Sequence, residues 1–326
     1  MNADHKQGCP GRSASHPDRR EFLKAAAAVS AAIYQAASSQ TIAAEKETKQ
    51  VLIVVGPSKH PPGTHEVAAG GRVMKYMLEH AEGVPAIAAE VVYKWPDEKN
   101  VLDRAATIVL IGDLFPGETL ENSAKVKADI ARLMGNGCGM VCVHYATGLQ
   151  AKHVADDGDH PLLGWIGGYF ATGCKHHRSV ARVCPATLTP ETADHPVLRG
   201  WKAFSFTDEP YWNNYFGKDG PAKNVTPLVS TMLPPESPKK ETVVWAVERA
   251  DGGRGMGIVV PHFFHNWNID DLRTLVLNGI CWSAKLPIPP QGVKSSLPDL
   301  ATFKPVSVEP QARKSSEAAR KKTGKS

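Results

Sequence analysis

Residues 139–148 read GMVCVHYATG, and this stretch sets the expectation for the fold. Its first half is a short apolar run of the kind that is buried in a parallel sheet. The run leads to His144, which has the small residues Cys142 and Ala146 two positions away on either side. This spacing is typical of a sharp strand-to-helix turn that projects its central side chain from the sheet. We therefore expect His144 at the carboxyl edge of an open α/β sheet.

The alternation of strands and helices extends towards the N-terminus. Apolar runs predict strands at residues 50–56 (QVLIVVG), 86–93 and 106–113, and helical spacing of apolar residues predicts helices at 66–80 and 119–135. Strand–helix–strand order of this kind predicts a doubly wound, mostly parallel sheet with helices on both faces, as in flavodoxin-like proteins.

Towards the C-terminus the predicted strands become shorter, and a closing helix follows them. These strands are residues 179–184, 203–208, 226–231, 242–247 and 257–263, and the helix is 269–284. We assign residues 45–286 to one α/β domain, because this length is enough for one sizeable core. Residues 287–326 are rich in Pro, Lys, Ser and Ala, and we predict that they form a disordered basic tail.

Residues 1–44 resemble a twin-arginine export signal. Arg19 and Arg20 precede Phe22-Leu23-Lys24, and an Ala-rich, weakly apolar stretch with small residues at its end follows. The alternative is an Ala-rich amphipathic helix with an incidental Arg pair. No other stretch approaches the ~20 apolar residues that a membrane span needs. We expect a mature protein that is periplasmic and not inserted in the membrane.

The charge distribution speaks against nucleic-acid binding. The formal net charge is +5, of which residues 1–44 contribute +2 and residues 291–326 contribute +5, so that the body between them carries −2. Because the excess of positive charge lies at the two ends, the predicted domain offers no electrostatic case for nucleic-acid binding.

The cysteines fit an export pathway for proteins that fold before transport. Cys9 leaves with the predicted signal, and the five remaining cysteines cannot all pair and show no C-x-x-C metal spacing. Cys142 and Cys281 stand in apolar runs typical of buried positions. A bridge between Cys174 and Cys184 is left open.

Polar residues that directly follow strands are the candidates for a site, because open α/β sheets bind ligands beyond the carboxyl ends of their strands. Histidines are frequent at these positions. The candidates are His60, His65, Glu66, His144, Asp208, Glu209, Tyr211, His262, His265 and Trp267, together with His176, His177 and Arg178 after the turn at 167–170.

This set suggests a divalent metal site, with zinc as the first choice, whose tentative ligands are His65, Glu66, His144, His176, His262 and His265. The alternative is a metal-free pocket in which the histidines form hydrogen bonds or transfer protons. No nucleotide cofactor is expected.

Neighbouring residues on an extended chain point to opposite faces, so only one of Asp208 and Glu209 can face the pocket directly. Glu209 shares its face with Tyr211, and we assign the proton-transfer role to Glu209. Asp208 either binds substrate or caps a turn. Trp267 either stacks on a sugar or packs in the core, and His177 and Arg178 either bind substrate or lie in a solvated loop.

The residue at the predicted turn excludes one reaction. Glutamine amidotransferases and serine hydrolases carry Cys or Ser there, whereas His144 does not form an acyl intermediate as readily. The sequence therefore lacks the nucleophile that a glutaminase needs, and we expect no ammonia release from glutamine.

Several segments together resemble the ThuA-like (trehalose utilisation) family, whose fold is that of class I glutamine amidotransferases without the catalytic cysteine. The matching segments are residues 139–148, 165–170, 195–212, 243–257 and 261–282. One position departs from the family pattern, since Pro261 stands where many members have Gly. The resemblance implies a site at His144, Glu209 and His262 and a role in carbohydrate metabolism, often beside sugar dehydrogenases that make keto-sugars.

These observations lead to a hypothesis of an exported carbohydrate-active enzyme that hydrolyses, eliminates or isomerises a keto-sugar or glycoside. Its catalytic residues are His144, Glu209, His262 and Tyr211, and its substrate-binding residues are Asp208, His177, Arg178 and Trp267. The alternative is a carbohydrate-binding or scaffold protein that has lost the chemistry. The expected partner is a carbohydrate, and the oligomeric state is left open.

Overall fold

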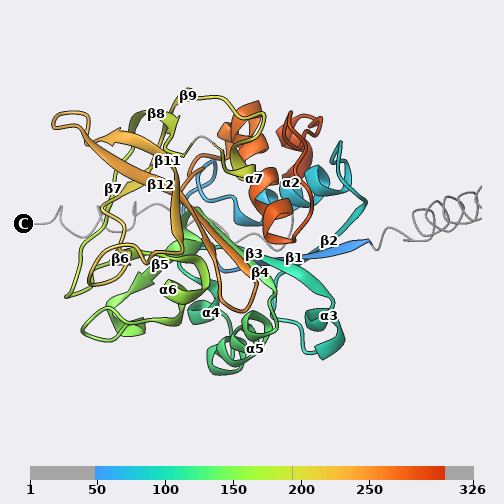
Figure 1. Cartoon of the computed structure of the whole chain (residues 1–326), viewed down its shortest axis with the longest axis horizontal. Helices are drawn as coiled ribbons and strands as arrows, with labels where there is room; N and C mark the ends of the chain where they lie inside the picture. The colour runs from blue at the N-terminus through green and yellow to red at the C-terminus, as the bar shows by residue number, and fades with distance from the viewer. Residues whose placement is uncertain (1–47, 193, 305–326) are drawn as a thin grey trace, which may run out of the picture. The chain divides into compact units, whose positions relative to one another are not determined.

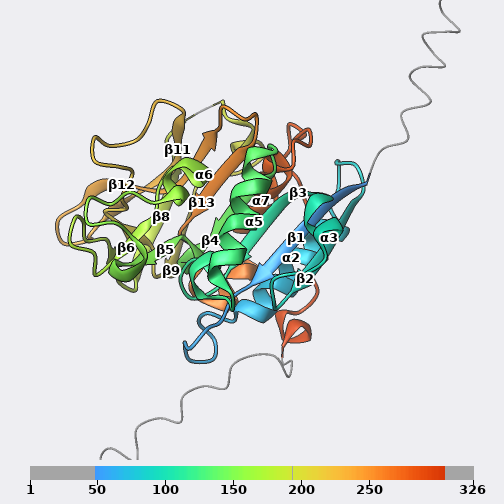
Figure 2. The same ribbon diagram turned by 90° about the horizontal axis from the view of Figure 1, so that it is seen from below.

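The computed structural model describes residues 48–192 and 194–304. The predicted export signal, residues 1–44, lies outside the described residues, as does the end of the predicted tail from residue 305. Within the described part, one sheet of nine strands runs through the molecule in the order β2-β1-β3-β4-β13-β12-β11-β8-β9 (Figures 1 and 2).

One half of this sheet is parallel. Its neighbouring strands β2, β1, β3, β4 and β13 all run in the same direction. They comprise β1 (Lys49–Val55), β2 (Ile87–Val92), β3 (Ala105–Ile111), β4 (Gly139–Val143) and β13 (Arg254–Ile258). Residues 51–55 of β1 are all buried, which explains why the strand is a continuous apolar run. The strands predicted at 50–56, 86–93 and 106–113 are confirmed.

The other half of the sheet is antiparallel. It comprises β12 (Lys239–Glu248), β11 (Val225–Leu233), β8 (Cys184–Pro190) and β9 (Phe204–Asp208). The expectation of a mostly parallel sheet is therefore too simple, and the fold is an α/β fold with a large mixed sheet. The reason is local, since the short turn between β12 and β13 can join only antiparallel neighbours.

Helices lie on both faces of the sheet. Figure 1 shows α2 and α7 on one face and α4, α5 and α6 on the other. The helices are α2 (Val67–Glu79), α3 (Lys99–Asp103), α4 (Pro116–Thr119), α5 (Ser123–Gly135), α6 (Pro161–Ile166) and α7 (Asp270–Ser283). No helix in residues 48–192 and 194–304 has the length and apolar character of a membrane span.

Short elements connect these layers. Two small sheets pair β5 (Gly148–Gln150) with β6 (Phe170–Thr172), and β7 (Val180–Ala181) with β10 (Tyr211–Trp212). The 3₁₀ turns are η1 (His144–Thr147), η2 (Ala151–His153), η3 (Pro196–Leu198), η4 (Phe264–Asn268) and η5 (Leu300–Phe303). Cys174 and Cys184 are both free thiols, so the bridge between them that was left open is not formed.

The prediction of disorder from residue 287 is wrong for residues 287–304. This segment passes from α7 to α2 and adds the buried residues Ile288, Val293, Leu300 and Phe303 to the core. Arg72 on α2 also donates a 2.8 Å hydrogen bond from Nε to the carbonyl oxygen of Phe303. The Pro- and Lys-rich composition hid four well-spaced apolar residues, which are enough to hold an irregular segment on the domain.

Replacing Phe303 with Ala is expected to destabilise the domain by about 3 kcal/mol, because it leaves a cavity beneath η5. Urea unfolding of the two proteins measures this difference. Ser296→Ala, a change at an exposed position of the same segment, serves as the control and should change the free energy of unfolding by less than about 0.5 kcal/mol. Equal stability of Phe303→Ala and wild type would contradict the packing of this segment.

Candidate metal centre

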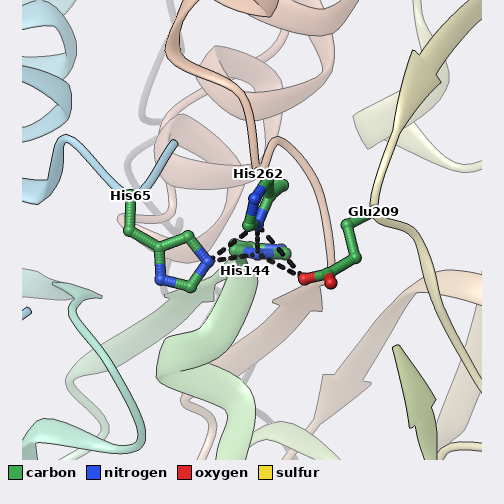
Figure 3. Close-up of side chains that lie close together, drawn as sticks. All are labelled: His65, His144, Glu209 and His262. Atoms are coloured by element: carbon green, nitrogen blue, oxygen red, sulfur yellow. Dashed lines mark hydrogen bonds and ion pairs between the residues drawn. The ribbon is translucent and has the colours of Figure 1, made fainter. Parts of the chain in front are cut away.

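Four side chains from different loops meet at the carboxyl edge of the sheet. They are His65 from the loop between β1 and α2, His144 at the end of β4, His262 after β13 and Glu209 after β9. Figure 3 shows the four side chains pointing towards one another. Parallel strands end at the same edge of a sheet, so β1, β4 and β13 bring the three histidines together although they are far apart in the sequence.

The distances between the facing atoms are short. His65 Nε2 lies 2.9 Å from both His144 Nε2 and His262 Nδ1, and the latter two atoms are 3.2 Å apart. Glu209 Oε2 lies 3.2 Å from His262 Nδ1 and 4.0 Å from His144 Nε2. Ligand atoms around a tetrahedral zinc ion with bonds of 2.0–2.1 Å are about 3.3 Å apart. The four residues therefore fit a single small cation.

The backbone at His144 has the conformation predicted for a sharp turn. Its φ is 50°, which is the left-handed region that residues other than Gly rarely adopt. The side chain of Thr147 donates a 2.7 Å hydrogen bond to the carbonyl oxygen of His144 and holds the turn. Such a conformation costs on the order of 1–3 kcal/mol and is concentrated at functional sites. The strain places the imidazole in the cluster.

Hydrogen bonds on the far side of two rings decide where their protons lie. His144 Nδ1 is 2.9 Å from the carbonyl oxygen of Val259, which can only accept, so Nδ1 carries the proton. His65 Nδ1 is 2.6 Å from a carboxylate oxygen of Asp113, which likewise accepts from it. Both Nε2 atoms are then left with lone pairs that face each other at 2.9 Å. Two lone pairs repel at this distance unless a cation or a proton lies between them.

Asp113 is the carboxylate that orients this side of the cluster. Burial by itself would raise its pKa, but hydrogen bonds with His60, His65 and the backbone N–H of Lys59 outweigh burial and hold the pKa well below its ordinary value. Asp113 is therefore ionised at neutral pH. A carboxylate behind a histidine ligand is a common arrangement at zinc sites, where it fixes the tautomer and raises the basicity of the ring.

A close approach of two loops makes the hydrogen bond between Asp113 and His65 possible. A Cβ atom at Gly112 would lie 2.9 Å from the Cα of Gly56, so only glycine fits where the chain leaves β3. Asp113 follows directly and accepts from the N–H of Lys59 at 2.6 Å. His60 Nδ1 lies 2.9 Å from the same Asp113 oxygen, Oδ2, and its ring stacks on His65 with 3.6 Å between centroids.

Burial keeps His144 and His65 neutral. Desolvation lowers the pKa of His144 well below its ordinary value, and the neighbouring His65 and His262 lower it further. Desolvation also lowers the pKa of His65, because its effect exceeds that of the hydrogen bond to Asp113. Neutral imidazole is the form that binds metals.

Asp208, Glu209 and Tyr211 divide the roles as their alternation in the sequence predicts. Glu209 and Tyr211 face the cluster, and the Tyr211 hydroxyl lies 3.0 Å from His144 Nε2. Asp208 is fully buried and accepts hydrogen bonds from the backbone N–H of His262 at 2.7 Å and from the Asn266 amide at 2.6 Å. Burial raises the pKas of both Asp208 and Tyr211. Asp208 thus holds His262 in place, which corrects its assignment as a substrate-binding residue.

Three of the tentative metal ligands lie outside the cluster. His176 Nε2 is 2.8 Å from the Tyr169 hydroxyl, His265 is exposed and stacks on Phe263, and Glu66 Oε1 accepts from the Gly63 N–H. Their assignment as ligands was wrong, because they follow the same strand ends or turns but their side chains point elsewhere.

Two of the predicted substrate contacts have structural roles. His177 Nε2 lies 2.6 Å from the carbonyl oxygen of Asn213. Arg178 is exposed and only its backbone carbonyl accepts from the Asn213 amide, so its assignment to substrate stays a prediction. Trp267 is only 3% exposed and lines a cavity of about 20 Å³ beside the imidazoles. This cavity has room for one or two small atoms, not for a sugar ring, so Trp267 belongs to the core.

Asp113 was missing from the predicted site, and His60 was among the strand-end candidates but was given no role. Asp113 ends the predicted strand at 106–113, so the rule that singled out the other strand-end residues would also have found it. Pro261, the departure from the family pattern, does not displace His262, since its imidazole meets both other rings.

Three imidazoles and a carboxylate at the carboxyl edge of a mixed α/β sheet define a candidate metal-binding α/β protein. The chain belongs to the ThuA family, described as trehalose utilisation, whose sequence model matches residues 50–283. A search of curated proteins finds no match.

Two solved ThuA-like structures share the fold at low identity. A ThuA-like protein from Bacteroides uniformis is 17% identical with a TM-score of 0.51, and the match covers 73% of this chain and 92% of that one. A ThuA-like protein from Parabacteroides merdae is 17% identical with a TM-score of 0.50, and covers 80% and 100%. A glutamine amidotransferase from Methylobacillus flagellatus is 10% identical with a TM-score of 0.34, and covers 68% and 75%.

Asp113→Asn is expected to weaken zinc binding about 10- to 100-fold, because the amide no longer fixes the tautomer of His65 as a carboxylate does. Competition with a chromophoric chelator measures the affinity. Asp129→Asn is the matched control, since Asp129 also accepts from a ring N–H, that of Trp95, but has no contact with the cluster. Equal affinities of wild type and Asp113→Asn would contradict the orienting role.

The metal-free protein is expected to lose stability as the pH falls below about 6.5. In the unfolded chain His65 and His144 take up protons near that pH, whereas in the folded chain their lowered pKas keep them neutral. Each of the two contributes up to about 1.4 kcal/mol per pH unit. Thermal unfolding of chelator-treated protein between pH 7.5 and 5.5 measures the effect. His144→Gln should make the dependence shallower, and an unchanged dependence would argue against a buried neutral His144.

Proposed function

We propose that this protein is a metal-dependent enzyme that acts on a carbohydrate at a carbonyl group or an adjacent carbon. The observation that supports the proposal most directly is the pair of lone pairs on His65 and His144, which face each other at 2.9 Å with their protons held on the opposite side of each ring. A divalent cation removes this repulsion. His65, His144 and His262 would hold it, with Glu209 within reach.

The nature of the donors favours zinc among divalent ions. Neutral imidazoles with one carboxylate suit zinc and related transition metals, whereas magnesium and calcium prefer oxygen ligands. A bound ion of this type polarises a carbonyl oxygen or lowers the pKa of a bound water. The proton transfers of the reaction must then be carried out by side chains of the protein.

Glu209 is the residue suited to proton transfer. Its side chain is 21% exposed, whereas those of His144 and His262 are 5% and 8% exposed, so a substrate reaches the carboxylate first. The backbone N–H of Glu209 donates to Asp208 at 2.6 Å, which holds the residue beside His262. A carboxylate in this place can take a proton from a carbon next to a carbonyl group, or from a water molecule. Hydrolysis, elimination and isomerisation of a keto-sugar each use such a step.

The small cavity limits how the substrate enters. About 20 Å³ beside the imidazoles admits an oxygen atom but not a ring. The sugar therefore remains at the mouth of the site, where the side chain of His60 is 34% exposed and Tyr145 is half-buried. The Tyr211 hydroxyl, whose pKa burial raises well above its ordinary value, stays protonated and can donate to an oxygen that reaches the cluster. Export to the periplasm, as residues 1–44 suggest, is part of the proposal.

Metal content and turnover test the proposal together. Protein purified without added metal is expected to contain one divalent ion per chain, and to convert an oxidised disaccharide with a keto group but not its unoxidised parent. His144→Ala should lose both metal and turnover. Glu209→Gln keeps the three imidazole ligands, so it should retain bound metal and lose about 10²- to 10⁴-fold in kcat through loss of the proton-transfer carboxylate.

His176→Ala, a change at a histidine outside the cluster, is the control and should retain metal and turnover. A metal-free wild type that binds sugars without converting them would overturn the proposal in favour of a binding protein. Full activity of Glu209→Gln would overturn the role of Glu209.

A further inference from the structure

A second, larger cavity lies at the carboxyl ends of β1 and β2. Its volume is about 520 Å³, within the range of about 300–1,000 Å³ that is common for ligand sites. Its lining shares only Val67 with the lining of the small cavity beside the imidazoles, so the two spaces are separate. Segments that follow both neighbours of β1 contribute to its lining, residues 93–97 after β2 and residues 119–126 further on after β3.

Two aromatic side chains on the wall of this cavity are half-buried and held in place. Trp95 Nε1 donates a 3.0 Å hydrogen bond to Asp129, and Arg72 donates a 3.2 Å hydrogen bond to the Tyr93 hydroxyl. Because their polar ends are anchored, the rings lose little freedom when a ligand packs on them. The walls therefore include a preformed aromatic surface.

The charged residues of the lining are balanced. Lys94 and Lys125 are opposed by Asp97 and Glu121, and all four are exposed at the rim. A phosphate or other anion would meet two carboxylates, and a cation would meet two ammonium groups. A neutral ligand with many hydroxyls suits these four charged side chains, since each hydroxyl can donate to a carboxylate and accept from a lysine.

We propose that this cavity binds a neutral sugar ring of a mono- or disaccharide, with the apolar face of the ring on the aromatic surface and its hydroxyls at the charged rim. The buried side chains of Val55 and Val126 provide an apolar floor. This binding site does not depend on metal or turnover at the imidazoles. It adjoins them at Val67, which lines both spaces, and at the loop after β1, where the Pro57 carbonyl accepts from the Asp113 N–H at 2.8 Å.

Isothermal titration of the full chain with trehalose, sucrose and maltose tests the proposal, with inorganic phosphate as the charged comparison. Wild type is expected to bind at least one of these disaccharides saturably and phosphate not at all. Trp95→Ala should weaken sugar binding about tenfold through loss of the ring contact. Lys94→Ala and Glu121→Ala, which change exposed side chains and leave the core intact, should each weaken it about threefold or more.

Two further variants separate this site from the metal centre. Trp165→Ala removes a half-buried tryptophan that lines no part of the cavity, and it should bind sugar like wild type. His144→Ala should keep sugar binding even though it loses metal and turnover. The proposal is overturned if none of the disaccharides binds, if Trp95→Ala, Lys94→Ala and Glu121→Ala all bind like wild type, if phosphate competes, or if His144→Ala abolishes binding.

Discussion

One hydrogen bond, from His144 Nδ1 to the carbonyl oxygen of Val259, connects the main architecture of this protein to its chemistry. It joins the carboxyl ends of β4 and β13, which are parallel neighbours in the sheet. By holding the proton on Nδ1 it also directs the lone pair of Nε2 into the space between His65 and His262. The left-handed backbone at His144 is the strain that this arrangement requires.

Two aspartates hold the other two histidines of the cluster in a similar way, through hydrogen bonds outside the space between the imidazoles. Asp113 orients His65, and Asp208 holds the backbone of His262 while its neighbour Glu209 faces the other way. Asp113 acts through the nitrogen of His65 on the side away from the cluster, and Asp208 acts through the backbone of His262. Each aspartate thereby decides where one of the facing nitrogens points. Hydrogen bonds of this kind orient the side chains before any ligand arrives, which is the property that metal binding and catalysis both use.

Much of the parallel half of the fold could be predicted from the sequence, because buried parallel strands are continuous apolar runs and their helices have a clear period. The antiparallel half and the packed segment 287–304 were predicted less well. Direction of pairing depends on turns such as the one between β12 and β13, and the packing of Val293 or Phe303 depends on surfaces that only the folded domain provides. Of the candidate site, the strand-end rule and the family resemblance found His65, His144, Glu209, Tyr211 and His262.

The sequence by itself determined which residues end the strands, and therefore which histidines and carboxylates can reach the carboxyl edge. It also determined that Glu209 and Tyr211 share a face, since alternation along an extended chain is local. Only the tertiary structure decided that His176, His265 and Glu66 turn away, and that Asp113 stands behind His65. The physical reason is that the direction of a side chain on a loop is set by partners distant in the sequence, whose positions exist only once the chain has folded.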